Sequence, residues 1–308
     1  HVDRFLMVVN ASNEDKIWAW INLVNDGKAL IDRSWPIRSR MQPAVIKRLR
    51  DPQWGEECKV LIALQGRGSR DALYQLMQGA QREQMMLMRK RDLIETVVAD
   101  IDVVLSRTGY TGEAICYELF VHPDRAAQLW RKLLDLDVGV TPCGLGARDS
   151  LRTEVGLPLY GHELAGPFEI SPNGAGFGGY VKLHKPFFNG KTAYIASEAE
   201  RDMKIIRFRV PQKGTRPLKH GDPLTDHRGA FAGNITSCVV DGRGTMVGLA
   251  YVPQKYADEK SLLAHPLPAG KAEPCTPIDL GPGKRLVVSV QIKVMPRFPR
   301  KDVTKESE

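Results

Sequence analysis

Apolar and polar positions alternate in a way that predicts strands and amphipathic helices in turn along the first part of the chain. Residues 5–10 form an apolar β-type run, which ends in an Asn-Ala-Ser-Asn cluster typical of a helix N-cap. Behind this cluster the apolar residues recur at helical spacing. Residues 59–65 predict a strand that ends at Gly66, and Ser69 is expected to cap the helix that follows.

The next segment predicts an antiparallel hairpin and two more helices. Residues 93–106 favour two strands, which lead into a Gly-Tyr-Thr-Gly turn at 109–112, and residues 117–121 favour the return strand. One helix is expected to open at Pro123, and a second to cover 145–155 and end at Gly156. Helices interleaved with antiparallel hairpins indicate an α+β fold.

After residue 201 the pattern changes to strands separated by Gly, Pro and Asp turns, with no helical periodicity between them. The expected strands are 204–210, 230–240, 245–252 and 286–294. This pattern predicts a small β-barrel or sandwich. We therefore expect an α+β region at 1–200, a C-terminal β-barrel at 201–297 and a basic tail at 298–308, with an exposed Pro-rich insertion at 264–283.

Composition narrows the class of protein. The 308 residues are 43% hydrophobic and 26% charged, as in ordinary globular proteins. No apolar run has the length of a membrane span, and no leader of the secretory type opens the sequence. The five cysteines contain no Cys-x-x-Cys pair, which argues against a disulfide framework or a zinc ribbon and favours a cytoplasmic, reducing compartment.

The net charge of +8 can attract nucleic acid, a membrane surface or an acidic protein. The basic stretches at 82–91 and 293–305 lack the interleaved aromatic residues of a single-strand binding surface. We therefore expect solvated basic faces or an acidic protein partner, and neither nucleic acid nor membrane as a partner.

Several common site signatures are missing. No glycine run has the context of a dinucleotide fingerprint or a Walker loop, and there is no Gly-x-Ser-x-Gly elbow. The seven histidines show no metal-ligand spacing. His162 is expected to be a structural hydrogen-bonding group. Cys143 stands beside a helix start, where its pKa can fall, but a buried structural thiol is the favoured interpretation.

Charged residues around the predicted hairpin are the remaining candidates. Glu118 lies on the return strand, where its side chain should be accessible from one face of the sheet. Arg148 and Asp149 lie in the first turns of the next helix, with Arg152 one turn later. Taken alone, all four would be surface charges, the helical ones in pairs one turn apart.

Two motifs change this interpretation. Thr108-Gly-Tyr-Thr-Gly-Glu113 is followed by an aromatic-Glu-aliphatic strand, and Ala-Arg-Asp-Ser-Leu-Arg occupies 147–152. Together with Val-Val-Asn before the first helix, they resemble the folate-binding core of the glycine cleavage system T-protein (aminomethyltransferase) family. The similarity runs over nearly the whole chain, from about residue 5 to residue 294.

The resemblance implies a T-protein-like fold, with a ferredoxin-like α+β region and a C-terminal β-barrel around a folate channel. It also implies tetrahydrofolate as cofactor and one-carbon transfer to its N5 as function. By position, Glu118 would grip the pterin ring, and Arg148, Asn10 and Tyr110 would complete the cofactor-binding residues. The family's acidic catalytic residue would lie upstream of His1. The implied partner is a small one-carbon donor or an acidic lipoyl carrier protein.

Two of the departures from the family pattern concern the expected folate pocket. Gly174 stands where the family commonly has an acidic residue, and Gly179 where it commonly has a Trp that lines the folate site. These changes suggest a donor other than the aminomethyl-lipoyl carrier. The alternatives are a tetrahydrofolate-dependent O- or S-demethylase, a folate-binding module of a larger oxidase or dehydrogenase, and a folate-sensing or scaffold protein without catalysis.

Overall fold

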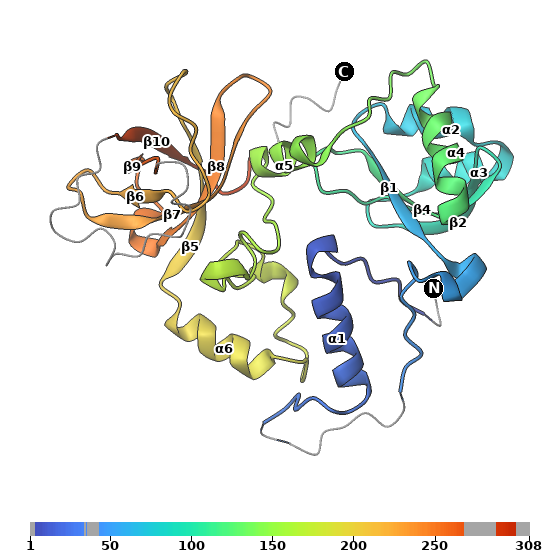
Figure 1. Ribbon diagram of the computed structural model, residues 1–308, viewed down its shortest axis with the longest axis horizontal. Helices are drawn as coiled ribbons and strands as arrows, with labels where there is room; N and C mark the ends of the chain where they lie inside the picture. The colour runs from blue at the N-terminus through green and yellow to red at the C-terminus, as the bar shows by residue number, and fades with distance from the viewer. Residues whose placement is uncertain (1–3, 34, 36–42, 268–287, 300–308) are drawn as a thin grey trace.

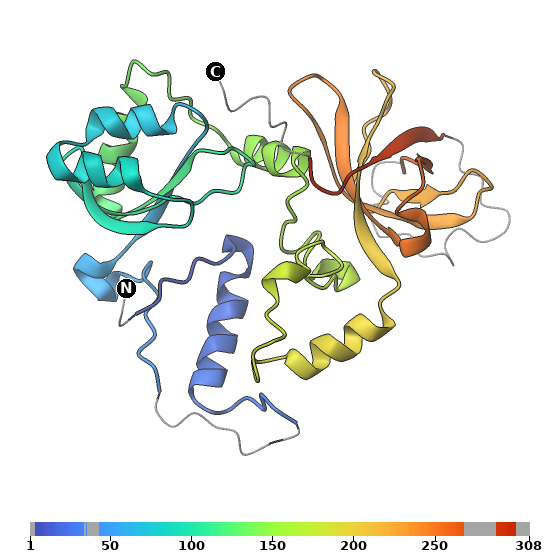
Figure 2. The ribbon, with the colours of Figure 1, turned by 180° about the vertical axis from the view of Figure 1, so that it is seen from behind.

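The protein is described here by a computed structural model that covers residues 4–33, 35, 43–267 and 288–299. An α+β layer and a β-barrel lie at opposite ends of the molecule (Figure 1). Helix α5, Leu145–Glu154, lies between them, and α1, Glu14–Asn25, and α6, Lys191–Glu200, lie on the remaining side. The reverse view shows the same arrangement (Figure 2). The expected α+β fold ending in a barrel is confirmed.

The α+β layer is built on a four-stranded antiparallel sheet of order β1-β4-β3-β2. Its strands are β1 Val60–Gln65, β2 Leu93–Val98, β3 Ile101–Ser106 and β4 Cys116–Val121. Helices α2 Ser69–Leu76, α3 Gly79–Leu87 and α4 Pro123–Leu134 contribute to one apolar core with the sheet, so they cover a single face. Because side chains alternate along a strand, the opposite face carries the residues left for other contacts.

The barrel is closed by six strands in the order β10-β5-β8-β7-β6-β9. Their bounds are β5 Met203–Arg209, β6 Pro223–Thr225, β7 Phe231–Val240, β8 Met246–Pro253, β9 Ser261–Ala264 and β10 Val290–Met295. Closure removes the unpaired edges that a small sheet would expose. The interior is filled by apolar side chains such as Phe208, Ile235 and Ala250, all fully buried.

Short 3-10 turns complete the chain. They are η1 Ala11–Asn13, η2 Pro52–Glu57, η3 Gly166–Phe168, η4 Gly178–Tyr180 and η5 Gln254–Tyr256. No helix in the described part of the chain is long and apolar enough to cross a membrane.

The structure corrects some local expectations. Residues 5–10 form no strand: Phe5 is fully exposed, and no described strand pairs with this segment. An apolar run becomes a strand only when a neighbour satisfies its backbone groups. Ser69 is the first residue of α2, and Gly68 is its N-cap. Helices α3 and α6 and the short strands β6 and β9 were not anticipated. The Pro-rich insertion and the basic tail lie largely outside the described residues.

Two positions on β7 allow a test of the barrel core. Ile235 is fully buried, whereas Val240 is 57% exposed. Ile235→Ala should lower the free energy of unfolding by about 2–5 kcal/mol, because it removes buried apolar contacts and leaves a cavity. Val240→Ala, the control, should change it by less than about 0.5 kcal/mol. Urea unfolding followed by circular dichroism measures both, and equal effects would contradict the assigned register.

Candidate functional site

The Gly-Tyr-Thr-Gly turn joins β3 to β4 and is packed too tightly for side chains at its glycines. A Cβ atom on Gly109 would stand 2.3 Å from Gln65 Oε1 and 2.4 Å from Cys116 Cβ. Gly112 has a φ of +85°, and a Cβ there would stand 2.4 Å from Cγ1 of Val155. Only glycine fits such positions. The turn is therefore seated between the end of β1 and the end of α5.

Tyr110 fastens this turn to the segment that follows α5. Its hydroxyl donates a hydrogen bond to the carbonyl of Pro158. Burial raises the pKa of Tyr110 to about 12, against the opposing charges of Arg152 and Arg148, so the phenol stays neutral and remains a donor. Since the hydroxyl is used within the protein, Tyr110 offers a ligand its aromatic ring.

Glu118 lies in the middle of β4, on the sheet face that the helices leave uncovered. Its cross-strand partners are Ala63 on β1 and Ser106 on β3. The side chain is half-buried, and its Oε2 accepts a hydrogen bond from the hydroxyl of Thr108. This position agrees with the expectation that Glu118 is accessible from one face of the sheet. The result is a carboxylate held on a rigid strand with acceptor capacity to spare.

Arg148 projects from the first turn of α5, where it is exposed. Within the described part of the chain no carboxylate forms an ion pair with it. It lies near enough to the Tyr110 phenol to lower that group's pKa, although burial outweighs it. The structure thus places Arg148, on α5, near Tyr110. Tyr110 lies on the turn that leads to β4, the strand that carries Glu118.

Asn10 lies on a different element, at the start of η1 and α1. Its Oδ1 accepts hydrogen bonds from the backbone N–H of Ser12 at 3.1 Å and from the Ser12 hydroxyl at 2.6 Å. Asn10 therefore caps the 3-10 turn η1, whereas Asn13, the N-cap of α1, makes no side-chain cap hydrogen bond, so the expected N-cap cluster is confirmed for the turn and not for the helix itself. Because the oxygen is already engaged, what Asn10 can offer a ligand is its amide N–H groups. Among the described residues Asn10 makes its side-chain hydrogen bonds within its own turn and not with Glu118, so its place in the site stays a prediction.

A buried ion pair, which the sequence did not reveal, connects α5 to the loop after it. Arg152 and Glu163 are both fully buried, with Nη1 and Oε2 2.7 Å apart. Arg152 was expected at the helix surface, and this expectation was wrong. Its Nε also binds Asp149 at 2.7 Å, three residues earlier on α5. An arginine on a helix has no local sequence signal for burial, because its partner comes from another element.

The barrel completes this cluster through Ser237. Its hydroxyl accepts from Arg152 Nη2 at 2.9 Å and donates to Glu163 Oε1 at 2.6 Å. The register of β7 shifts between Ile235 and Ser237, and such a bulge re-aims the side chain that follows it. His162 Nδ1 lies 3.4 Å from the same hydroxyl, which fits its expected structural role.

Two further expectations concern single residues. Cys143 is exposed rather than buried, with its thiol 3.5 Å from the carbonyl of Thr141. The four cysteines in the described residues are free thiols. At Gly174, a Cβ would meet Ile170, Arg201 and Ser171 at 3.3–3.4 Å, which leaves little room for a carboxylate. A Cβ on Gly179 would meet no atom beyond its chain neighbours within 4 Å, so the space there is open.

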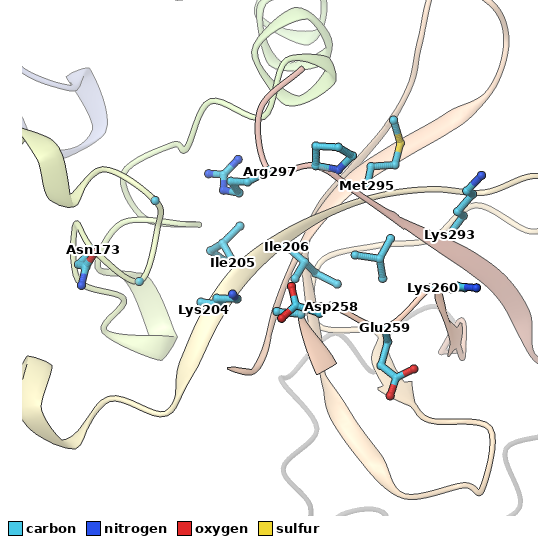
Figure 3. Close-up of a pocket in the computed structure, with 15 residues that line it drawn as sticks. Asn173, Lys204, Ile205, Ile206, Asp258, Glu259, Lys260, Lys293, Met295 and Arg297 are labelled. Carbon is cyan, nitrogen blue, oxygen red and sulfur yellow. The ribbon is translucent and has the colours of Figure 1, made fainter. Parts of the chain in front are cut away.

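A cavity of about 520 Å³ lies elsewhere, beside β5 and β10 of the barrel. Residues of β5 and β10 line it together with Asn173, Gly174, Gly176 and residues 257–260, and Figure 3 shows Asn173 and Lys293 on opposite sides of the group of lining residues. It contains none of the four predicted site residues. Among the described residues no cluster of His, Cys, Asp and Glu could hold a metal ion.

The buried ion pair makes a prediction about stability and its pH dependence. Burial raises the pKa of Glu163, but Arg152, Ser237 and the Leu159 N–H outweigh it and hold that pKa below its ordinary value of 4.5. A lowered pKa stabilises the fold fully above the ordinary value, and the contribution is lost as the pH falls through the lowered one. Wild-type protein should therefore lose stability in acid through this carboxyl.

Glu163→Gln should cost about 3–5 kcal/mol of unfolding free energy at neutral pH, because it removes the buried negative charge and leaves the buried guanidinium with only the partly exposed Asp149 carboxylate. Asp149→Asn, at a carboxylate that is 41% exposed, should cost less than about 1 kcal/mol. Urea unfolding between pH 3 and 7 measures both. The Glu163→Gln protein should also lose the acid-dependent component described above; an unchanged acid slope would count against the assigned cause.

Comparison with known proteins identifies the family of the chain. The family model described as the GCVT N-terminal domain matches residues 1–185. An aminomethyltransferase of Alkaliphilus metalliredigens is 37% identical over 202 residues, which are 64% of this chain and 52% of the relative. An aminomethyltransferase of Symbiobacterium thermophilum is 34% identical over 264 residues, 81% of this chain and 62% of the relative.

A solved structure, the glycine cleavage system aminomethyltransferase T from Bartonella henselae, superposes with a TM-score of 0.61 at 25% identity. The match covers 77% of this chain and 58% of that one. The chain thus spans between about half and three fifths of the length of these relatives. On the match over residues 1–185 and on these identities, the chain belongs to the glycine cleavage T-protein (GCVT) family.

Proposed function

We propose that the chain binds tetrahydrofolate and takes part in tetrahydrofolate-dependent one-carbon transfer. The observation that carries the proposal is the Glu118 carboxylate, held by Thr108 on the open face of the sheet beside the Tyr110 turn. Family membership supports the same conclusion, because the relatives are named aminomethyltransferases. Tetrahydrofolate supplies a nucleophilic N5 that takes up a one-carbon unit.

The residues present fit the pterin group. A pterin edge carries adjacent N–H donors, and a carboxylate accepts two such donors in a charge-assisted, bidentate pair. Glu118 provides this carboxylate in half-buried surroundings, where charge-assisted hydrogen bonds are stronger than in water. The aromatic ring of Tyr110 adds an apolar surface on the turn that precedes the same strand.

Arg148 and Asn10 would complete the recognition. Arg148 forms no ion pair in the described residues, so its guanidinium is available for a carboxylate or for stacking on a ring. Asn10 would contribute its amide N–H groups from the start of α1. Each of these groups binds or orients the cofactor, so the contribution of this part of the chain is positioning and exclusion of water.

The one-carbon donor is the finer part of the proposal. The net charge of +8 favours an acidic partner, such as an acidic lipoyl carrier protein. A small O- or S-methyl donor is the second candidate, and two positions favour it. At Gly174, where the family commonly has an acidic residue, neighbouring atoms leave little room for a carboxylate. At Gly179, where the family commonly has a Trp that lines the folate site, the space is open and glycine brings no aromatic ring to fill it.

Substitution of Glu118 tests the binding site. Glu118→Gln keeps the size of the side chain but removes its charge, so it should weaken tetrahydrofolate binding by about 2–4 kcal/mol. Asp102→Asn on β3 is the control. Asp102 lies on the same face of the sheet as Ser106, nearer the other end of the strand, and its side chain is exposed. Calorimetric titration measures both affinities. Equal affinity of Glu118→Gln and wild type, with intact circular dichroism, would remove Glu118 from the site.

A further inference from the structure

Three oxygen-bearing side chains form a line across β3, the turn and β4. Ser106 and Glu118 are direct cross-strand partners, so both side chains lie on the same face of the sheet. Thr108 follows two residues after Ser106, where β3 has ended. Its Oγ1 lies 2.9 Å from Ser106 Oγ and hydrogen-bonds Glu118 Oε2. Ser106 is 5% exposed, so its hydroxyl faces protein rather than solvent.

The direction of these hydrogen bonds follows from the number of protons. An ionised carboxylate only accepts, so Thr108 donates its hydroxyl proton to Glu118. A threonine hydroxyl has one proton, which leaves Thr108 as the acceptor towards Ser106. The protons therefore run from Ser106 to Thr108 to Glu118. Such a series strengthens each of its bonds and fixes the orientation of the terminal acceptor.

We infer that Thr108 is a positioning residue for Glu118 and, through it, a determinant of ligand specificity. The inference rests on the proposed function. With Oε2 fixed by Thr108, the carboxylate plane cannot rotate freely, and the remaining lone pairs stay aligned for two neighbouring donors. The site then selects ligands with an amino group next to a ring N–H, as in the 2-amino-4-oxo edge of a pterin. Preorganisation of this kind raises affinity by reducing the ordering needed on binding.

A second threonine in the same turn provides a matched control. The hydroxyl of Thr111 donates to Oε1 of Gln65 at 3.1 Å, so it supports the turn without reaching Glu118. Thr111 is buried, at 9% exposure, and Thr108 is half-buried. Loss of either hydroxyl disturbs the turn, but only loss of the one on Thr108 releases the carboxylate.

The experiment is calorimetric titration of the full chain with 5-formyltetrahydrofolate, a stable reduced folate, and with its analogue that lacks the 2-amino group. Thr108→Val should weaken binding of the parent folate about tenfold and weaken the analogue less, so that the ratio of the two affinities falls. Thr108→Ser should restore both affinities to within about twofold of wild type, because it restores the hydroxyl. Thr111→Val should leave the affinity ratio unchanged. Thr108→Val in a Glu118→Gln background should have no further effect.

The outcomes separate this inference from the function on which it rests. If Glu118→Gln loses binding while Thr108→Val keeps both the affinity and the ratio, the positioning role is wrong and the folate site stands. If wild type does not bind, or Glu118→Gln binds as wild type does, the proposed site itself is wrong. If Thr108→Val does not fold, Ser106→Ala and Thr108→Ala take its place: a reduced affinity ratio supports the inference, and an unchanged ratio overturns it.

Discussion

The buried ion pair between Arg152 and Glu163 is the interaction on which the arrangement of the molecule depends. Two fully buried charges are tolerated only when their polar atoms are satisfied. Here Ser237 of the barrel binds both partners, and the Leu159 N–H and the Leu157 carbonyl bind one each. The pair therefore needs α5, the loop after it and β7 to be in place at once. It joins the barrel to the helix that bears Arg148.

The candidate site is in contact with the same segment, at and after the end of α5, that the buried ion pair holds in place. The turn at 109–112 packs its Gly112 against Val155, and Tyr110 bonds the carbonyl of Pro158. Both contacts are made with the segment that Arg152 and Glu163 hold. The relative positions of Glu118 and Arg148 are therefore set by close contacts between the turn and the segment after α5. This is the support that a binding constellation requires to hold its geometry.

Within the site, the polar groups divide into those that hold the structure and those available to a ligand. The hydroxyl of Tyr110 and the Oδ1 of Asn10 are engaged by the protein itself. Arg148 and the remaining acceptor capacity of Glu118 are not used in this way in the described residues. One cation and one oriented carboxylate suit a ligand with N–H donors on one side and anionic groups on the other. This division supports the proposal of a folate as the ligand.

Much of this protein was determined by its local sequence. Period-two and period-3.6 patterns located β1 to β4, α4, α5 and four of the barrel strands, because a buried face imposes its period on the chain. The Gly-Tyr-Thr-Gly motif predicted Glu118 as a binding residue. The strands β6 and β9 were missed because three or four residues are too few to show a period.

What only the tertiary structure decided is which residues meet. Residues 5–10 have a strand pattern but no described strand as neighbour, and without one the backbone has no ladder to join. Arg152 and Arg148 are both arginines of the same helix, yet Arg152 is buried and Arg148 exposed, because Glu163 and Ser237, the residue after the bulge in β7, both bind Arg152. Thr108 reaches Glu118 through the register of β3 and β4. Periodicity is local and so can be read along the chain, whereas pairing, burial of charge and strand register depend on partners that the sequence does not place.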